Sequence, residues 1–246
     1  MRFLTLGSLM LTLPLVGCGT KQYRHVEPSG FLGDYSKMVE GKSNEALSVY
    51  VNPQADCRKY SKAIIEPVVF QEIPGYTTLA SLKAEDQSML LALGRETISS
   101  AMREGQFEIV DQPGPDVLRV KSAIIEADKA NMVMALGLSV APYLWEISTV
   151  WGVSAGKWPF LGELAGEMEI SDAQTGERLF ASVDKVVGTL FSTLNPINVW
   201  GDVRDGFEFW RIREGKRMKS CRATGSFHMP EDERGWMRKT FDYMAP

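Results

Sequence analysis

The most regular pattern in the chain is an alternation of apolar and polar residues near its middle. Leucine, glycine, methionine and isoleucine occupy the even positions of residues 164–170, while alanine and glutamate occupy the odd positions. A period of two predicts a β-strand with two different faces. A polar turn at 172–176 leads into another apolar run at 178–187, so the two runs predict a β-hairpin.

Four other runs, rich in β-branched residues, predict further strands. The longest spans residues 116–127, and shorter runs cover 47–51, 60–70 and 107–110. Pro67 interrupts the run at 60–70 and cannot donate a backbone hydrogen bond to a sheet. We therefore expect an edge position or a bulge there.

Apolar residues at helical spacing predict a helix in the first half of the chain. Leu90, Leu93, Thr97 and Ala101 recur three or four residues apart, which places them on one helix face. Ser81 is the expected N-cap, and Gly105 is the expected stop.

A second amphipathic helix is predicted from Gly201 to about Lys219, where Val203, Phe207 and Trp210 share a face. Together these elements predict an α+β fold. We expect an antiparallel or mixed sheet of four or five strands, with two helices packed on one face.

The N-terminus carries an export signal that ends at a cysteine. Arg2 gives a positive start, and residues 3–16 form an uncharged apolar run that is too short to span a bilayer. The sequence from Leu15 to Cys18 resembles the bacterial lipobox, whose cysteine receives acyl chains such as palmitate and begins the mature protein. Two or more chains hold a protein firmly on a membrane. The alternative is an ordinary secretory signal in which Cys18 is incidental.

This signal divides the chain. Residues 1–17 are the signal peptide, and residues 18–52 form a lipid-anchored tether whose apolar part docks on the domain. Residues 53–221 form the α+β domain, and residues 222–246 are polar and predicted to be a flexible tail. Gly19 follows the cysteine, where lipoproteins retained in the inner membrane often carry aspartate, so we expect the periplasmic face of the outer membrane.

Charge and cysteine content narrow the expected partners. The net charge of −4 becomes −5 once Arg2 is lost, which argues against a nucleic-acid partner. Cys57 and Cys221 remain after the anchor, and an oxidising periplasm permits a disulfide between them. Two buried free thiols are the alternative that the sequence leaves open.

The segment 131–158 is unusual because Glu146 is its one acidic residue, between two uncharged runs, and it carries Trp145, Trp151 and Trp158. Tryptophan is enriched at membrane interfaces and in binding hot spots. Three interpretations remain open: an insertion folded over the sheet as core, a membrane-apposed segment, or a subunit contact.

Candidate chemistry is sparse. His25 and His228 both lie in segments predicted to be flexible, so neither indicates a catalytic or metal site, and we expect no cofactor and no metal. Two acid pairs occur in or near predicted strands, Glu126 with Asp128 and Glu167 with Glu169. Alternate strand residues share a face, so each pair could bind a cation or transfer protons. A solvated strand face is the interpretation that we favour.

A basic run on the second predicted helix also has two possible interpretations. Its residues could meet anionic lipid headgroups, but we favour the solvated side of a helix. They are Arg211, Arg213, Lys216, Arg217, Lys219 and Arg222.

Several short motifs follow the signal peptide. They are Ser29-Gly-Phe-Leu32 with Asp34-Tyr-Ser36, then Tyr50-Val-Asn-Pro53, then Arg58-Lys-Tyr60 and Ile64-Ile-Glu-Pro-Val68. With the turn at 172–176 and the helix at 202–210, they resemble an uncharacterised family of proteobacterial lipoproteins catalogued as a domain of unknown function. The resemblance covers about residues 26–220. It implies a lipid-anchored envelope protein and no known activity, so no catalytic residue is carried over.

These observations predict a non-enzymatic lipoprotein that acts as a structural or assembly subunit of the cell envelope. Its partners would be the membrane, through acyl chains on Cys18, and further copies or another envelope protein, through residues 131–158. The alternative is a module that binds a small apolar ligand, such as a lipid, between that segment and the sheet. The sequence contains no catalytic triad, phosphate loop or metal-ligand spacing, which argues against an enzyme.

Overall fold

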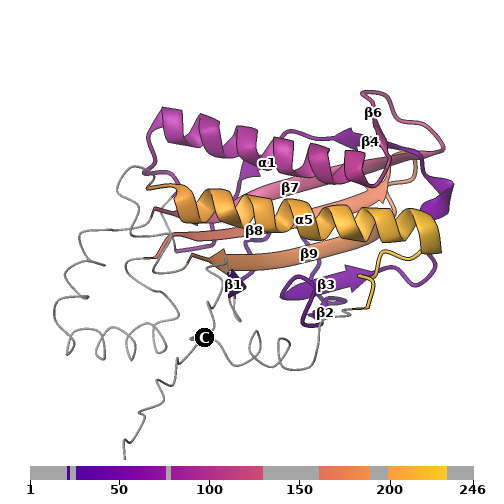
Figure 1. Ribbon diagram of the computed structural model, residues 1–246, viewed down its shortest axis with the longest axis horizontal. Coiled ribbons are helices and arrows are strands. Elements are labelled where there is room, and N and C mark those ends of the chain that lie inside the picture. Colours follow the sequence, from indigo (N-terminus) through magenta and orange to yellow (C-terminus); the bar gives the residue numbers. More distant parts are fainter. Residues whose placement is uncertain (1–20, 23–25, 76–78, 130–160, 189–198, 232–246) are drawn as a thin grey trace, which may run out of the picture.

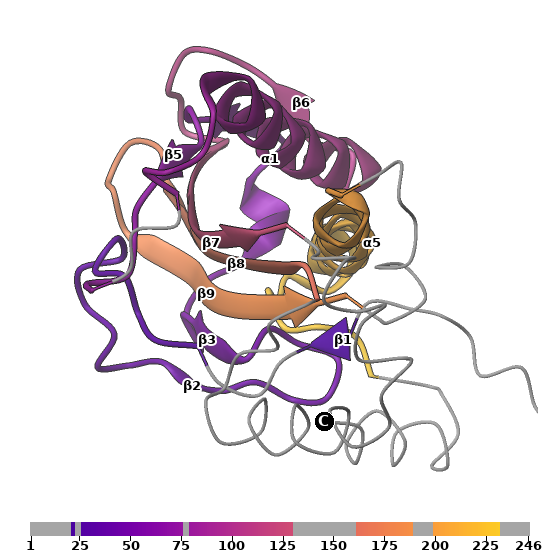
Figure 2. The same ribbon diagram turned by 90° about the vertical axis from the view of Figure 1, so that its left-hand side faces the viewer.

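The computed structural model describes residues 21–22, 26–75, 79–129, 161–188 and 199–231. Within these residues, two α-helices lie side by side on one face of a mixed β-sheet (Figures 1 and 2). The predicted α+β class and the two helices on one face are confirmed.

Within the described residues the sheet contains nine strands, so the expectation of four or five is wrong. Five strands have four or more residues and coincide with predicted runs: β3 (Ser48–Val51), β4 (Lys62–Ile65), β7 (Val117–Asp128), β8 (Glu163–Asp172) and β9 (Arg178–Val187). The other four have two residues each: β1 (Lys21–Gln22), β2 (Val39–Glu40), β5 (Val69–Phe70) and β6 (Glu108–Ile109). Two residues are too few to show a period of two, so β1 and β2 left no pattern in the sequence.

The sheet order is β2-β3-β9-β8-β7-β4-β6, with β1 beside β9 and β5 beside β7. Neighbours from β2 to β7 are antiparallel, whereas β4 is parallel to both β7 and β6. β4 pairs with the first part of β7 and β5 with a later part, on either side of Pro67. Among the described strands, β5 pairs with β7 alone, so the edge position that is one of the two alternatives expected at this proline is confirmed.

Helix α1 spans Ala84–Glu104. Its N-cap is Lys83 and not Ser81, because the helix begins two residues later than predicted and has no side-chain cap. Glu85 and Asp86 lie in its first turn, where negatively charged carboxylates interact favourably with the helix dipole. Gly105 ends the helix as predicted.

Helix α5 spans Gly201–Thr224, five residues beyond its predicted end. It stops at Gly225, whose φ of 84° is a left-handed conformation that glycine adopts readily. Phe227 follows and is fully buried, with its ring stacked 6.4 Å from that of Phe180. Residues 222–229 therefore belong to the packed domain and not to a flexible tail; residues 232–246 lie outside the described ranges.

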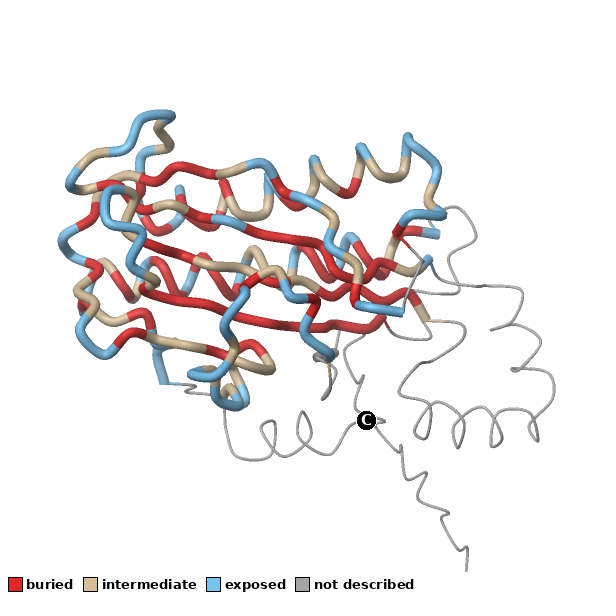
Figure 3. Tube along the Cα trace, turned by 180° about the vertical axis from the view of Figure 1, so that it is seen from behind, coloured by how far each residue is buried: buried red, intermediate tan, exposed pale blue. Residues whose placement is uncertain are grey.

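Both faces of the central strands are covered. On one face, α1 and α5 bury residues of β7 such as Leu118, Val120 and Ile124. On the other face, Ala123 and Ile125 of the same strand pack with Leu32, from the segment that follows the predicted signal peptide. Figure 3 shows the resulting runs of buried backbone along the strands. Residues of either parity in β7 are therefore inside the protein.

A disulfide joins the edge of the domain to its last helix. The sulfur atoms of Cys57, in the short 3-10 helix Cys57–Lys59, and Cys221, in α5, are bonded. Both residues are fully buried within one core cluster. The bond links positions that are 164 residues apart in sequence.

Candidate functional site

Some residues singled out from the sequence lie outside the described ranges. These are Cys18, Trp145, Trp151 and Trp158, whose anticipated roles remain predictions, and His25, for which no site role is expected. His228 is described and exposed, with its Nδ1 atom 3.9 Å from Glu45 Oε1.

The buried carboxylate of Glu167 holds the segment that follows the predicted signal peptide. Its Oε1 accepts a hydrogen bond from the backbone N–H of Ser29 at 2.7 Å. Its Oε2 accepts from the Leu32 N–H at 3.3 Å and from the Tyr35 hydroxyl at 2.6 Å. Burial and the bond to Glu167 raise the pKa of Tyr35 to about 12, so its hydroxyl stays protonated and continues to donate.

A second charged residue on the same face completes this docking. The Arg178 guanidinium donates to the carbonyl oxygens of Leu32 and Asp34, and its Nε donates to Glu169 at 2.6 Å. The Ser29-Gly-Phe-Leu32 and Asp34-Tyr-Ser36 motifs therefore have a structural role, which is to form hydrogen bonds with Glu167 and Arg178. We define residues 29–35 as the docked segment.

The other acid pair, Glu126 with Asp128, takes part in a separate buried cluster. Glu126 and Glu163 are both at most 3% exposed, and the Lys185 ammonium lies 2.8 Å from a carboxylate oxygen of each. Burial disfavours the charge on Lys185, but the carboxylates of Glu163 and Glu126 outweigh burial and raise the pKa of this amine. The solvated face expected for Glu126 and Glu167 is therefore wrong, because the face opposite the helices is also covered.

This cluster has some features of a cation site. Carboxylate oxygens of Glu126, Asp128 and Glu163 lie within 4.8 Å of one another, and oxygen clusters of this kind suit Ca²⁺. The Lys185 ammonium already lies among the oxygens, however, and supplies the positive charge that a metal ion would bring. We therefore interpret the arrangement as a buried ion cluster in which Lys185 balances the carboxylate charge.

A third charged group fastens α5 to the sheet. Asp184 of β9 accepts hydrogen bonds from Arg213 Nη1 at 2.5 Å and Trp210 Nε1 at 2.8 Å. Glu214 accepts from Arg213 Nε at 3.0 Å and Arg217 Nε at 2.8 Å. Burial opposes ionisation of Glu214, but the two guanidinium groups outweigh it and lower the pKa of this carboxyl.

Arg217 extends this group to the end of the domain. Its side chain is fully buried, donates to the Phe227 carbonyl at 2.8 Å and lies 4.3 Å from the Phe180 ring. The solvated side predicted for the whole basic run is therefore wrong for Arg213 and Arg217. Lys216 and Lys219 are exposed, as that interpretation requires.

A cavity of about 70 Å³ lies between the two helices and the sheet. Its walls are mostly apolar, and Ser122 of β7 contributes a buried hydroxyl that makes no hydrogen bond within the described residues. A buried hydroxyl without a partner is unfavourable, so it attracts a polar atom. The apolar lining includes Val68, Ile98, Met102, Phe207 and Met218.

None of the described helices is both long enough and apolar enough to cross a membrane. The fold defines a two-layer α+β domain with both helices on one side of the sheet.

The chain belongs to a family described as protein of unknown function (DUF3313), which matches residues 27–211. It is 27% identical over 131 residues to the uncharacterised lipoprotein YdcL of Escherichia coli, in strain K12 and in O157:H7. The match covers 52% of this chain and 58% of that protein, so the chain spans little more than half the length of this relative. The expected family is thereby confirmed, and the findings support a lipoprotein whose family has no assigned activity.

Two solved structures are similar in outline. One is a PelC dodecamer from Paraburkholderia phytofirmans, with a TM-score of 0.39 and 10% identity over 68% of this chain and 94% of that chain. The other is a DUF4136 family protein from Bacteroides thetaiotaomicron, with a TM-score of 0.33 and 12% identity over the same shares of the two chains.

Proposed function

We propose that the protein is a non-enzymatic lipoprotein on the periplasmic face of the outer membrane, where it acts as a structural or assembly subunit of the envelope. Acyl chains on Cys18 would hold it there. The observation that carries the proposal is the use of buried charge. Glu167 holds the docked segment on β8, Lys185 links β9 to β7 and β8, and Arg217 holds the Phe227 carbonyl against α5. A domain held together in this way offers a rigid surface to which a partner can bind.

The decisive test is the solution mass of a soluble version that begins at Gly19, measured by chromatography with light scattering. We expect a discrete oligomer that is lost when Trp145 and Trp151 are both replaced by Ser. Trp236→Ser changes a tryptophan of the polar tail and serves as the control. A monomer for the parent protein, or normal assembly of the double variant, would contradict the proposed role of residues 131–158.

The cavity favours a second function, the binding of a small, mostly apolar molecule with one polar group. Ser122 would supply the polar contact. At about 30 Å³ per water molecule, the cavity has room for about two waters, so an acyl chain would require α1 and α5 to separate. This size is the reason that we place ligand binding second.

Native mass spectrometry of the purified protein tests this second function. Ala101→Met fills the cavity, because Ala101 is buried and lines it. Ala92→Met is the control, since Ala92 is exposed on the same helix. A ligand should accompany the parent and Ala92→Met proteins but not Ala101→Met; an empty parent protein would rule the function out.

A further inference from the structure

The first described strand lies very close to the predicted lipid anchor. β1 pairs antiparallel with the end of β9, and its Lys21 and Gln22 lie opposite Val187 and Val186. Three residue steps separate Cys18 from Lys21. At 3.3 to 3.6 Å per extended residue, these steps span at most about 11 Å. A lipidated Cys18 must therefore lie close to the end of β9.

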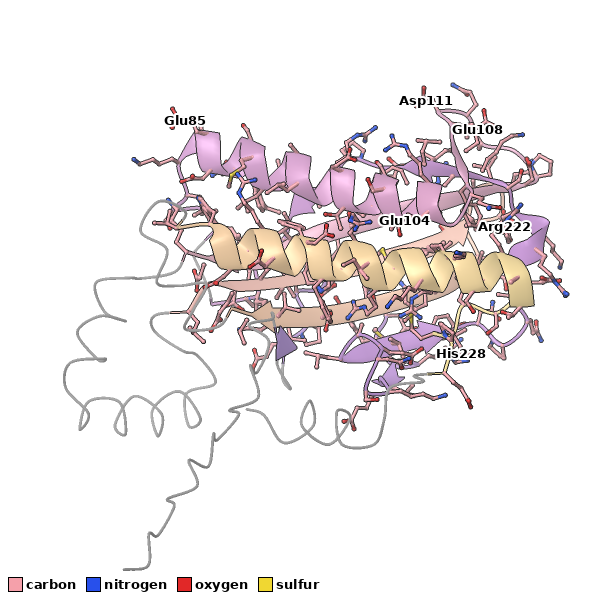
Figure 4. The ribbon with its side chains drawn as sticks, viewed as in Figure 1. Glu85, Glu104, Glu108, Asp111, Arg222 and His228 are labelled. Carbon is pink, nitrogen blue, oxygen red and sulfur yellow. A yellow bond between two sulfur atoms is a disulfide. The ribbon has the colours of Figure 1, made fainter. Side chains whose placement is uncertain are left out.

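That end of the domain gathers several chain ends. In the sheet, Asp128, Glu163 and Val187 are paired in one row, where β7 ends, β8 begins and β9 ends. Helices α1 and α5 also begin there, as the position of Glu85 in Figure 4 and the helix directions in Figure 1 show. We define this end, from the row Asp128–Glu163–Val187 to the first turns of both helices, as the anchor end.

The surface chemistry of the anchor end is compatible with lipid headgroups. Lys83 and Lys129 are exposed cations there, and Val199, before α5, is 43% exposed. Lys129 pairs with Asp86 at 2.7 Å and lies 5.0 Å from the Trp200 ring. Basic residues and apolar side chains occur together at membrane interfaces.

From this geometry we infer that the anchor end lies against the membrane surface to which Cys18 is attached. The inference rests on the lipid anchor of the proposed function and adds the orientation of the domain. Helix α5 has 24 residues and is about 36 Å long, so the opposite end, with Asp111 and the disulfide, projects into the periplasm. That far end is then the part available to partners beyond the membrane.

Fluorescence quenching by labelled lipid tests this orientation. Full-length lipidated protein is purified with its disulfide intact and placed in vesicles of phosphatidylethanolamine and phosphatidylglycerol that contain a headgroup nitroxide lipid. A single fluorophore is attached at Glu85→Cys or at Asp111→Cys, two exposed positions at opposite ends in Figure 4. We expect loss of fluorescence at Glu85→Cys and none at Asp111→Cys.

Two variants of one residue test the role of β1. Gln22→Pro removes a backbone donor and should break the pairing with β9, whereas Gln22→Ala leaves the backbone able to pair. Both variants keep the acyl chains on Cys18 and so stay anchored. In Gln22→Pro the first described residue that still packs on the domain is Val26, which allows a tether of up to about 29 Å from Cys18. Quenching at Glu85→Cys should fall in Gln22→Pro and persist in Gln22→Ala.

The possible failures differ from one another. If lipidated protein stays on the vesicles but both labels are quenched equally, the orientation is wrong while the anchor stands. If the parent protein and Cys18→Ser bind the vesicles equally poorly, the anchor itself is wrong, and the orientation falls with it.

Discussion

The Glu167 side chain is where the docked segment is attached most strongly. Hydrogen bonds to an ionised acceptor are stronger than those between neutral groups. Glu167 accepts three of them, from two backbone amides and one hydroxyl, and it is 2% exposed. One residue of β8 therefore sets the position of a segment more than 130 residues earlier in the chain.

Glu167→Gln should release this segment. The amide of glutamine removes the charge and places N–H donors toward the Ser29 or Leu32 N–H groups, and a buried donor left without an acceptor costs about 1 to 3 kcal/mol. We expect a lower urea midpoint and faster proteolysis within residues 29–35. Glu96→Gln, at a side chain that is 68% exposed, should change neither measurement. Unchanged protection of residues 29–35 in Glu167→Gln would show that other contacts hold the segment.

The Tyr35 hydroxyl makes this attachment sensitive to alkali. The folded pKa of about 12 lies above the ordinary value of 10, so the fold favours the protonated phenol. Its contribution to stability is complete below pH 10 and is lost as the pH rises from 10 to 12. Urea midpoints measured across this range should fall less steeply for Tyr35→Phe than for the parent protein. Parallel curves for the two proteins would argue against the bond to Glu167.

The burial of single charged residues could not be predicted from the pattern alone. Glu167 and Glu126 alternate with apolar neighbours, which normally indicates a solvated face. The docked segment covers part of that face, and its attachment depends on contacts between residues far apart in sequence. The identity of the docked segment was nevertheless visible, since Phe31, Leu32 and Tyr35 are too apolar for a spacer.

At the scale of elements, α5 is held by charge as much as by apolar contact. Gly206 permits close approach, since a Cβ there would lie 2.7 Å from a methyl group of Val186. Arg213 then reaches the buried carboxylate of Asp184 on β9, while Arg217 pairs with Glu214 within α5 itself. The glycine that weakens the helix locally is thus the residue that lets it approach the sheet.

Arg217→Met should destabilise the domain strongly. Removing one partner of a buried ion pair leaves the other charge uncompensated, at a cost of about 3 to 5 kcal/mol. The pKa of Glu214, now lowered chiefly by Arg217 and Arg213 against burial, should rise, so acid unfolding should begin at higher pH. Lys216→Met is the matched control at the exposed neighbouring position. Equal urea and acid midpoints for the two variants would contradict the role of Arg217.

Elements with a sustained period were predictable, and elements without one were not. The hairpin β8–β9, the long strand β7 and both helices follow from repeated local patterns. The two-residue strands exist because a neighbouring strand offers them hydrogen bonds, which is a property of the assembled sheet. The cavity and the Lys185 cluster depend on the same assembly, so no local signal could reveal them.

For the molecule as a whole, the disulfide joins the two ends of the folded domain. Cys57 lies shortly before β4, and Cys221 lies in the last turns of α5, so the bond closes nearly all of the α+β domain into one loop. Together with β1 on β9 and the docked segment on Glu167, it leaves the described chain attached near its start, its middle and its end.

Breaking the disulfide should therefore be costly. In the chain-entropy model, a closed loop of 164 residues contributes about 5 kcal/mol, because the bond restricts the unfolded chain. We expect a large drop in the urea midpoint when the purified protein is reduced, and a similar drop for the Cys57→Ala, Cys221→Ala double variant. Added reductant should not affect the double variant, which makes it the control for other effects of the reagent. Two titratable thiols per unfolded chain, in protein purified without reductant, would show that the bond does not form. The stability of the domain would then rest on its core and buried ion pairs alone.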